Sequence, residues 1–407
     1  MKKLNDNQSQ TAHSASEATM KNPHTVEGDL KARRKKTIVR RTKVVIFLLS
    51  LLLVFVYLAW VMGAANMLNT IMQTSYHLLL ETVLYIMAIT VISGALGNML
   101  VEFGVVRAVE RMLRPLMRPL FNLPGSAALG AILTFLSDNP AIITLSKDKN
   151  FARYFKKYQL ISLTNFGTAF GMGLIVILFM TSKGFMSGAL IGFVGAIIGS
   201  IISTRLMQRF ILKNYPKMAD NQVSEKVEEQ QVKESGDGIL LRFLNSILDG
   251  GKSGVEIGMS IIPGVLIIST VVMMMTFGEP AGGYSGGAYE GVPILSYLAE
   301  KFDTVLYWLF GFEHPQLVAF PITSLGAVGA ALGLVPKFIE EGIVTNNAIA
   351  VFTAMGMCWS GYLSTHAAML DTLGHRELIS KAILAHTIGG LMAGVIAHWL
   401  YQLVSLI

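Results

Sequence analysis

The stretch "GAILTFLSDNPAIITLSKDKN", residues 130–150, is an apolar segment with a polar centre. Its flanks are apolar enough for a membrane helix, but "SDNP" at residues 137–140 interrupts it. A carboxylate at membrane depth, such as that of Asp138, is costly and tends to serve a function. Proline favours the first position of a helix, where its missing N–H costs nothing. The stretch therefore predicts two half-helices, at about 125–136 and 140–148, that meet at this polar centre.

The whole chain has the composition of a membrane protein. Of its 407 residues, 52% are hydrophobic and only 14% are charged, against about 25% charged residues in a typical soluble domain. Its mean hydropathy is +0.54. Charge-free stretches long enough to span a bilayer occur at residues 44–80, 82–101, 158–182, 184–204 and 257–278. The sequence therefore predicts an all-α polytopic membrane protein, multi-pass in a lipid bilayer.

The N-terminal part is polar and ends in the basic tract "RRKKTIVRRTK", residues 33–43. Basic residues beside a span favour the cytoplasmic side. We therefore expect a disordered cytoplasmic tail at 1–43 and an additional transmembrane helix at 44–68, in the inner membrane of a bacterial cell. Nucleic-acid binding is the alternative explanation, but the net charge of +7 is mostly this orientation charge, so no nucleic-acid partner is predicted.

Residue types that carry enzyme chemistry are not grouped in this sequence. The single cysteine, Cys358, allows no disulfide within the chain and no cysteine cluster for zinc or iron–sulfur. We find no phosphate-binding fingerprint, metal-ligand set or nucleophile–base pair. The sequence therefore does not predict an enzyme, a bound metal or a cofactor.

Basic residues between the spans select a topology. The clusters at 107–118, 147–157 and 205–217 lie together in the cytoplasm only if residues 124–146 fold back as a re-entrant hairpin. A second hairpin at 315–336 has the same effect later in the chain. Irregular backbone at membrane depth is tolerated where protein or a water-filled cavity surrounds it, so the hairpin tips are natural places for ligand contact.

An internal repeat supports this topology. The segment "TAFGMG" (168–173) recurs 185 residues later as "TAMGMC" (353–358). Each segment lies within the same order of elements: a span (82–101; 257–277), an amphipathic stretch (105–121; 292–312), a short hairpin segment (124–146; 315–336) and two more spans (158–181 and 184–204; 345–370 and 380–404). The predicted repeats, 77–210 and 241–407, are inverted relative to each other and joined by a charged cytoplasmic linker at 211–240. A rival alignment of "FLSDNPA" with "YLSTHAA" leaves one element unmatched.

Polar side chains at the hairpin tips and on the two repeated helices are the candidate binding residues. Inverted repeats with broken helices are recurrent in secondary transporters, whose sites lie where the halves meet. The candidates are Ser137, Asp138, Asn139, Asn165, Thr168, Thr323, Ser324 and Thr353.

Several of these residues have a structural explanation as well. Asn139 is a suitable helix N-cap, and Asp138 either caps the amides of its own tip or handles a ligand or proton. Interhelical hydrogen bonds account for Asn165 and the threonines on the repeated helices. Two histidines, His366 and His386, are explained as packed or interfacial residues, with a proton relay as the alternative.

Two segments resemble the nucleoside-recognition, or Gate, domain family of bacterial integral membrane proteins. They are "VVRAVERMLRPLMRPLFNLPGSAALGAILTFLSDNPA" (105–141) and "SGVEIGMSIIPGVLIISTVVMMM" (253–275), and the resemblance covers about residues 80–404. Similar domains occur in concentrative nucleoside transporters, ferrous-iron uptake proteins and spore-maturation membrane proteins. The resemblance therefore implies a membrane transport-type fold and no particular substrate.

These observations together predict a transporter of a small polar solute, nucleoside-like or another organic metabolite. The inverted repeats imply secondary active transport by alternating access, driven by a sodium ion or proton gradient because the chain has no nucleotide-binding motif. The alternative is a non-transporting component of a membrane complex, as in the spore-maturation proteins. Whether the chain forms a homo-oligomer is left open.

Overall fold

The computed structural model describes residues 23–219 and 238–406, and the regular elements there are helices. The chain divides into two units, residues 1–64 and 65–407. Six helical runs in the described part are long and apolar enough to cross a membrane. The predicted class, an all-α polytopic membrane protein, is confirmed.

The first unit contains one long helix, α2 (Pro23–Met62), whose apolar part is Thr42–Met62. Gly63 follows in the left-handed conformation, with a φ of 81°, which commonly ends a helix. The predicted N-terminal transmembrane helix at 44–68 therefore ends earlier than expected. The predicted disordered tail at 1–43 is wrong from Pro23 onward, where the helix begins, and its earlier residues lie outside the described part.

The second unit contains two long helical runs that each include a π-helical turn. The first run consists of α3 (Ala64–His77), η1 (Leu78–Val83) and α4 (Leu84–Glu102). The second consists of α12 (Ile239–Pro263), η4 (Gly264–Ser269) and α13 (Thr270–Met274). The first run starts well before the span predicted at 82–101, because the polar residues around Glu81 do not interrupt it.

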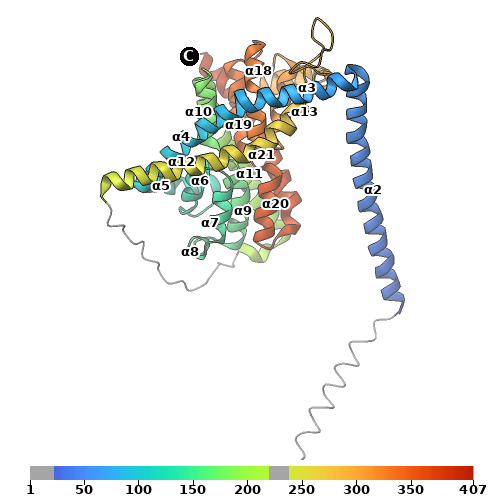
Figure 1. Cartoon of the computed structure of the whole chain (residues 1–407). Helices are drawn as coiled ribbons and strands as arrows, with labels where there is room; N and C mark the ends of the chain where they lie inside the picture. The colour runs from blue at the N-terminus through green and yellow to red at the C-terminus, as the bar shows by residue number, and fades with distance from the viewer. Residues whose placement is uncertain (1–22, 220–237, 407) are drawn as a thin grey trace, which may run out of the picture. The chain divides into compact units, whose positions relative to one another are not determined.

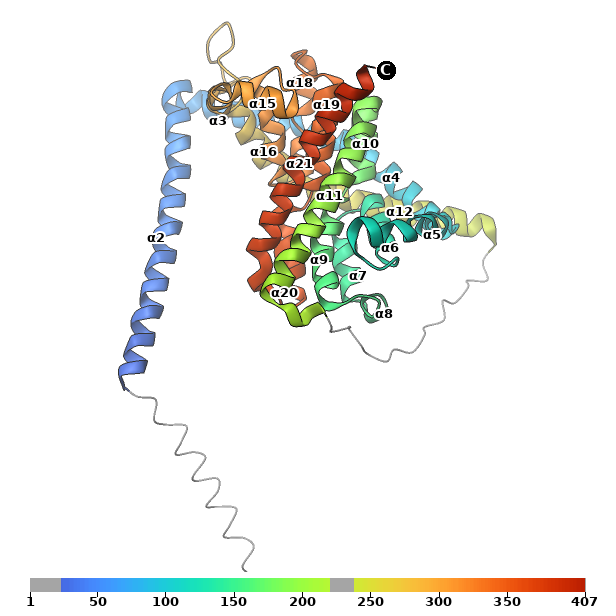
Figure 2. The same ribbon diagram turned by 180° about the vertical axis from the view of Figure 1, so that it is seen from behind.

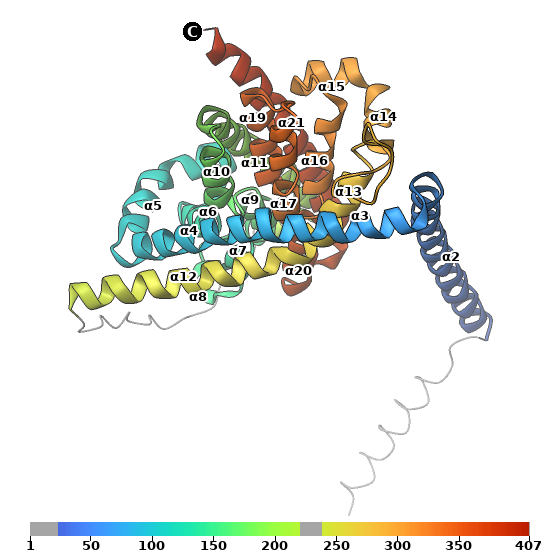
Figure 3. The ribbon, with the colours of Figure 1, turned by 45° about the horizontal axis from the view of Figure 1, so that its top comes forward.

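The helices α4 and α12 pack closely and antiparallel (Figures 1 and 3). The Thr90 hydroxyl donates to the Gly254 carbonyl at 2.7 Å, and the Asn98 amide donates to the Ser246 carbonyl at 2.9 Å. A Cβ atom added to Gly254 would lie 2.5 Å from the Val91 Cα. Small residues thus let the two backbones approach, as is common between membrane helices.

The first hairpin forms as predicted at 124–146. It follows α5 (Val105–Leu116) and the π-helical turn η2 (Met117–Phe121), and consists of α6 (Ala127–Leu136) and α7 (Pro140–Lys147). The short helix α8 (Lys149–Ala152) comes next. The two half-helices match their predicted bounds within two residues.

The span predicted at 158–181 is broken in the structure. It consists of α9 (Lys157–Thr168) and α10 (Gly173–Ser182). Met172, just before α10, has a φ of 56°, an uncommon conformation for a residue with a side chain. The unbroken helix α11 (Met186–Asn214) and the 3₁₀ turn η3 (Pro216–Ala219) follow. Most of the predicted linker at 211–240 lies outside the described residues.

The second half repeats this order of elements. The stretch predicted as one amphipathic element at 292–312 is two short helices, and the span predicted at 345–370 is broken at residues 359–361. The elements are α14 (Ile294–Glu300), α15 (Asp303–Phe310), η5 (Pro315–Val318), α16 (Ala319–Ser324), α17 (Val328–Leu332), α18 (Val335–Glu340), α19 (Asn346–Cys358), α20 (Tyr362–Thr372), η6 (Arg376–Leu378) and α21 (Ile379–Ser405).

Corresponding helices of the two halves run in opposite directions. A Cβ atom added to Gly195 of α11 would lie 2.9 Å from the Ala397 Cβ, and one added to Gly199 would lie 2.6 Å from the Ala393 Cβ. Because the partner number falls as the α11 number rises, α11 and α21 are antiparallel (Figure 2). The α4–α12 pair behaves likewise, which is the relation that an inverted repeat predicts.

The two six-residue segments that suggested the repeat do not occupy equivalent positions in the two halves of the structure. The segment 168–173 contains the first helix break, whereas 353–358 ends one residue before the second break. The repeated order of elements is therefore the better guide to the correspondence than the repeated letters.

Candidate functional site

Four interruptions of helical structure surround one cavity of about 330 Å³. They are the tips of the two hairpins, α6–α7 and α16–α17, and the breaks in the spans α9–α10 and α19–α20. The polar side chains that line it are Asp138, Asn139, Ser260, Ser360, Ser364 and Thr365. Its volume lies in the range of small-molecule sites, about 300–1,000 Å³.

The tip of the first hairpin supplies the only carboxylate among the residues that line this cavity. Pro140 occupies the first turn of α7, as predicted. Asp138 is half-buried and lines the cavity. Ser137 does not line it, because its hydroxyl donates to the Leu133 carbonyl of its own helix at 2.6 Å. The tip therefore presents the Asp138 carboxylate to the cavity and turns the serine away.

Asn139 links the hairpin to a helix break instead of capping α7. Asn139 occupies the N-cap position of α7 as predicted, but its side chain makes no capping hydrogen bond. Its Nδ2 donates to Asp138 Oδ1 at 3.0 Å and to Ser360 Oγ at 3.1 Å. Ser360 in turn donates to the Thr168 carbonyl at 3.0 Å. A chain of hydrogen bonds thus joins the hairpin tip to both broken spans.

Glycines at the two breaks make room for the Asn139 amide. A Cβ atom on Gly171 would lie 2.5 Å from Asn139 Oδ1, and one on Gly361 would lie 2.5 Å from Asn139 Nδ2. Asn139 is 3% exposed, and its Oδ1 has no hydrogen-bond partner among the described residues. Because a buried polar oxygen normally has a partner, this atom is available to a ligand or an ion.

The predicted residues of the second hairpin do not line the cavity. The Thr323 hydroxyl donates to the Ala319 carbonyl at 2.7 Å, and the Ser324 hydroxyl donates to the Phe320 carbonyl at 3.0 Å. Both hydroxyls therefore bond within α16. The second hairpin reaches the cavity with the turn that follows, at residues 326–329.

The three predicted residues on the broken spans also lie outside the cavity lining. Asn165 donates to Ser203 Oγ and to the Ala382 carbonyl, each at 2.9 Å, and so ties α9 to α11 and α21. The Thr168 hydroxyl bonds to its own helix. Thr353 is fully buried in α19. Interhelical hydrogen bonding, the simpler interpretation, describes the contacts of Asn165.

Sequence reasoning missed Ser260, Ser360, Ser364 and Thr365, which line the cavity from α12, the second break and α20. The polar run from Ser364 to His366 in an otherwise apolar segment was a usable signal. Ser260 gave none, because a lone serine on a membrane helix most often bonds to its own backbone, as it does here with the Ile257 carbonyl at 2.7 Å.

The two central histidines form a buried pair beside α20. The ring centroids of His366 and His386 are 4.6 Å apart, and neither ring is exposed. His366 Nδ1 lies 2.5 Å from the Tyr362 carbonyl, and His386 Nε2 contacts the Cys358 carbonyl. A carbonyl oxygen only accepts, so these nitrogens carry the hydrogens. His386 Nδ1 then accepts from Ser203 Oγ at 2.9 Å.

A buried carboxylate anchors the glycine-rich loop between α13 and α14. Glu290 is 6% exposed and accepts backbone N–H groups of Ser285, Gly286 and Gly287 as well as the Ser285 hydroxyl. Burial opposes ionisation of Glu290, but these hydrogen bonds outweigh it and lower the pKa of the carboxyl below its ordinary value. The ionised carboxylate therefore holds the loop in place.

Comparisons with known proteins point to one class of fold. No family model matches the chain. An uncharacterized protein of Alkalihalophilus pseudofirmus is 25% identical over 298 residues, which cover 68% of this chain and 59% of that protein. The chain thus spans about three fifths of the length of this relative.

Solved structures of CNTnw are similar over most of the chain. CNTnw in an inward-facing, substrate-bound state has a TM-score of 0.53 and 12% identity, covering 94% of this chain and 87% of that one. A CNTnw variant in an outward-facing state has a TM-score of 0.52 and 13% identity, covering 92% and 87%. These neighbours are concentrative nucleoside transporters, so the chain shares the fold of that class.

Proposed function

We propose that this protein is a secondary transporter that binds a small polar solute in the cavity around Asp138 and Asn139. The observation that carries the proposal is the meeting of two hairpin tips and two helix breaks at one polar cavity. Transporters built from inverted repeats place their sites at such discontinuous helices, which move against each other during alternating access. Similarity in fold to CNTnw in inward- and outward-facing states supports the same conclusion.

The chemistry of the cavity favours a solute with several hydrogen-bond donors, such as a nucleoside or a similar organic metabolite. The Asp138 carboxylate accepts hydrogen bonds, and the hydroxyls of Ser360, Ser364 and Thr365 can both donate and accept. The volume of about 330 Å³ limits the solute to a small molecule. CNTnw has been solved in a substrate-bound state, which supports a solute of the class that those transporters carry.

A monovalent cation is the proposed driver. The Asn139 Oδ1 atom lacks a partner among the described residues and lies beside the Asp138 carboxylate, so oxygen ligands for a sodium ion are already clustered there. A proton on Asp138 is the alternative carrier. Solute uptake in proteoliposomes under a sodium gradient alone, or under a proton gradient alone, distinguishes the two.

We infer that the protein lies in the bacterial inner membrane with its N-terminus in the cytoplasm. The support is the distribution of basic residues, which places the segment 147–157 on the cytoplasmic side. In a Cys358→Ser background, Lys156→Cys should react with an impermeant thiol reagent only from the inside, and Lys301→Cys only from the outside. Labelling of Lys156→Cys in intact cells contradicts this topology.

Substitution of Asp138 tests the binding site directly. The first step is a thermal-shift screen of nucleosides, nucleobases, amino acids and organic acids on the purified protein, followed by uptake of each stabilising compound in proteoliposomes. Asp138→Asn should abolish both the thermal shift and the uptake. Asp249→Asn, an exposed carboxylate on α12 far from the lining, is the matched control and should retain both. If Asp138→Asn retains both, the proposed site is wrong.

A further inference from the structure

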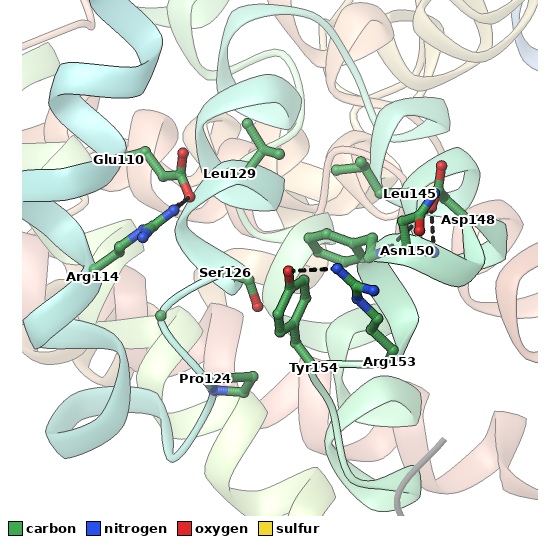
Figure 4. A pocket seen from close by; sticks show the side chains of 12 residues that line it. Glu110, Arg114, Pro124, Ser126, Leu129, Leu145, Asp148, Asn150, Arg153 and Tyr154 are labelled. Atoms are coloured by element: carbon green, nitrogen blue, oxygen red, sulfur yellow. Dashed lines mark hydrogen bonds and ion pairs between the residues drawn. The ribbon is translucent and has the colours of Figure 1, made fainter. Parts of the chain in front are cut away.

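A second cavity, of about 850 Å³, lies at the base of the first hairpin (Figure 4). Its walls are the end of α5, the turn that leads into α6, and the segment from the end of α7 through α8. It shares no lining residue with the central cavity. Its position beside residues 147–157 places it on the side that the basic clusters assign to the cytoplasm.

The two carboxylates of this cavity already have partners. Glu110 Oε1 accepts hydrogen bonds from both Nε and Nη2 of Arg114, at 3.1 Å and 2.9 Å. Asp148 Oδ1 accepts the backbone N–H groups of Asn150 and Phe151, at 2.7 Å and 3.0 Å, and so caps α8. Although the side chains that line the cavity carry equal numbers of positive and negative charges, both negative groups are engaged.

Arg153 is the lining residue whose charge is not compensated. Its guanidinium donates to the Tyr154 hydroxyl at 3.1 Å and stacks 5.1 Å from the centroid of that ring. It forms no ion pair with any carboxylate of the described residues. In Figure 4 the Arg114 guanidinium points to Glu110, whereas the Arg153 guanidinium, on the other side of the cavity, points to the Tyr154 hydroxyl. Guanidinium groups favour phosphate, which they bind through two parallel hydrogen bonds.

Ser126, at the start of α6, gives a second indication of a missing partner. Its hydroxyl oxygen is buried in the wall of this cavity and has no hydrogen-bond partner among the described residues. In Figure 4 its side chain lies between the α5 wall and Tyr154. Buried hydroxyls normally find a partner, so a ligand that brings phosphate oxygens would satisfy it together with Arg153.

The surroundings of the cavity match a membrane surface. Leu129, Leu145 and Phe151 give it an apolar wall. Helix α5 is amphipathic: the exposed residues Arg107 and Arg111 lie on its polar face, and the other face is apolar. Such a helix is typical of the boundary between headgroups and acyl chains, where arginines attract anionic lipids. The occupant should therefore combine a phosphate with an apolar part.

We propose that this cavity binds the headgroup of an anionic phospholipid, with the phosphate on the Arg153 guanidinium. The bound lipid would join α5 to both ends of the first hairpin, whose tip carries Asp138. The lipid therefore regulates the stability of the hairpin, and the membrane fraction of anionic lipid sets the extent of that regulation. This inference does not depend on which solute occupies the central cavity.

Lipid binding to the full-length protein tests the proposal. The wild type in phosphatidylcholine nanodiscs is compared with the wild type in nanodiscs that contain increasing phosphatidylglycerol, by thermal unfolding and by retained lipid in native mass spectrometry. We expect phosphatidylglycerol to raise the unfolding temperature with saturation. Arg153→Gln should weaken its apparent affinity about tenfold or more, the loss typical of a hydrogen bond to a charged group.

Four comparisons decide the outcome. Arg111→Gln removes an exposed arginine of α5 that does not line the cavity and should keep the wild-type affinity; an equal loss there means unspecific attraction and overturns the proposal. Arg153→Lys keeps the charge and should give an intermediate affinity, which also serves if Arg153→Gln fails to fold. An equal effect of phosphatidylcholine, or stabilisation by soluble glycerol phosphate alone, likewise overturns the assignment to an anionic lipid.

Discussion

Replacing Gly171 by alanine is the sharpest test of how the first hairpin and the broken spans fit together. The added Cβ would lie 2.5 Å from Asn139 Oδ1 and 2.6 Å from Asn139 Nδ2, and it would also touch the Ser360 hydroxyl. These distances are shorter than any real contact of a Cβ atom, so the Asn139 amide must move. Its hydrogen bonds to Asp138 and Ser360, at 3.0 Å and 3.1 Å, are then lost.

The cost follows from two terms. Overpacking of a tight interior costs about 1–3 kcal/mol, and each hydrogen bond between membrane-embedded groups contributes about 0.6 kcal/mol. Gly171→Ala should therefore lower the free energy of unfolding by about 2–4 kcal/mol. Asn139→Ala alone should cost only about 1 kcal/mol, because it removes two such hydrogen bonds together with an unsatisfied oxygen.

The double variant separates this explanation from a general effect of alanine. Because Asn139→Ala removes two of the three atoms in the way, Gly171→Ala/Asn139→Ala should unfold at a higher temperature than Gly171→Ala alone, measured in one detergent or nanodisc. Gly251→Ala is the matched control, since its Cβ would meet only the Val91 side chain, at 3.7 Å, and should be neutral. Additive destabilisation in the double variant would falsify the proposed packing of Asn139.

Two further predictions concern the long helices and the anchored loop. Gly254→Ala should destabilise the protein by about 1–3 kcal/mol, because its Cβ would meet backbone atoms of Thr90 and Val91 that cannot rotate away; unfolding as in Gly251→Ala would contradict the α4–α12 packing. Glu290→Gln should lower the unfolding temperature at neutral pH. The lowered pKa of Glu290 means that its contribution is complete above the ordinary carboxyl pKa and is lost as the pH falls through the folded-state pKa. The difference between wild type and Glu290→Gln should thus shrink in acid, and a constant difference argues against the ionised anchor.

Much of the fold follows from features that the sequence states directly. Apolar lengths predict most of the long helices, basic clusters predict the hairpin at 124–146, and a proline preceded by polar residues locates its tip. The breaks in the spans were missed because they depend on tertiary contacts. Met172 adopts a φ of 56° although nothing in its side chain favours it, and the neighbouring Gly171 packs against Asn139 of the hairpin, a contact that no local pattern predicts.

The candidate site was predicted only in part, and the missed residues again depend on tertiary contacts. A charged residue such as Asp138 has few satisfactory places in a membrane, so its type alone indicates a site. The hydroxyls of Thr323 and Ser324 can bond to their own helix, and they do so at 2.7 Å and 3.0 Å. No local pattern tells such hydroxyls from those that line a cavity, as Thr365 does. That distinction depends on which helices meet.

The two hairpin tips are held in different ways, and this predicts which of them opens more readily. The first tip is tied to the second helix break through the hydrogen bond from Asn139 to Ser360. At the second tip, the backbone N–H groups of Gly326 and Ala327 both bond to the carbonyl of Thr323 within the same turn. Segments with few tertiary hydrogen bonds open locally at lower free energy. The amides of Gly326 and Ala327 should therefore exchange with deuterium about threefold faster, after correction for intrinsic rates, than those of Ser137 and Ala141, since a hydrogen bond between membrane-embedded groups contributes about 0.6 kcal/mol. Faster exchange at the first tip would show that the contacts of Asn139 do not hold it.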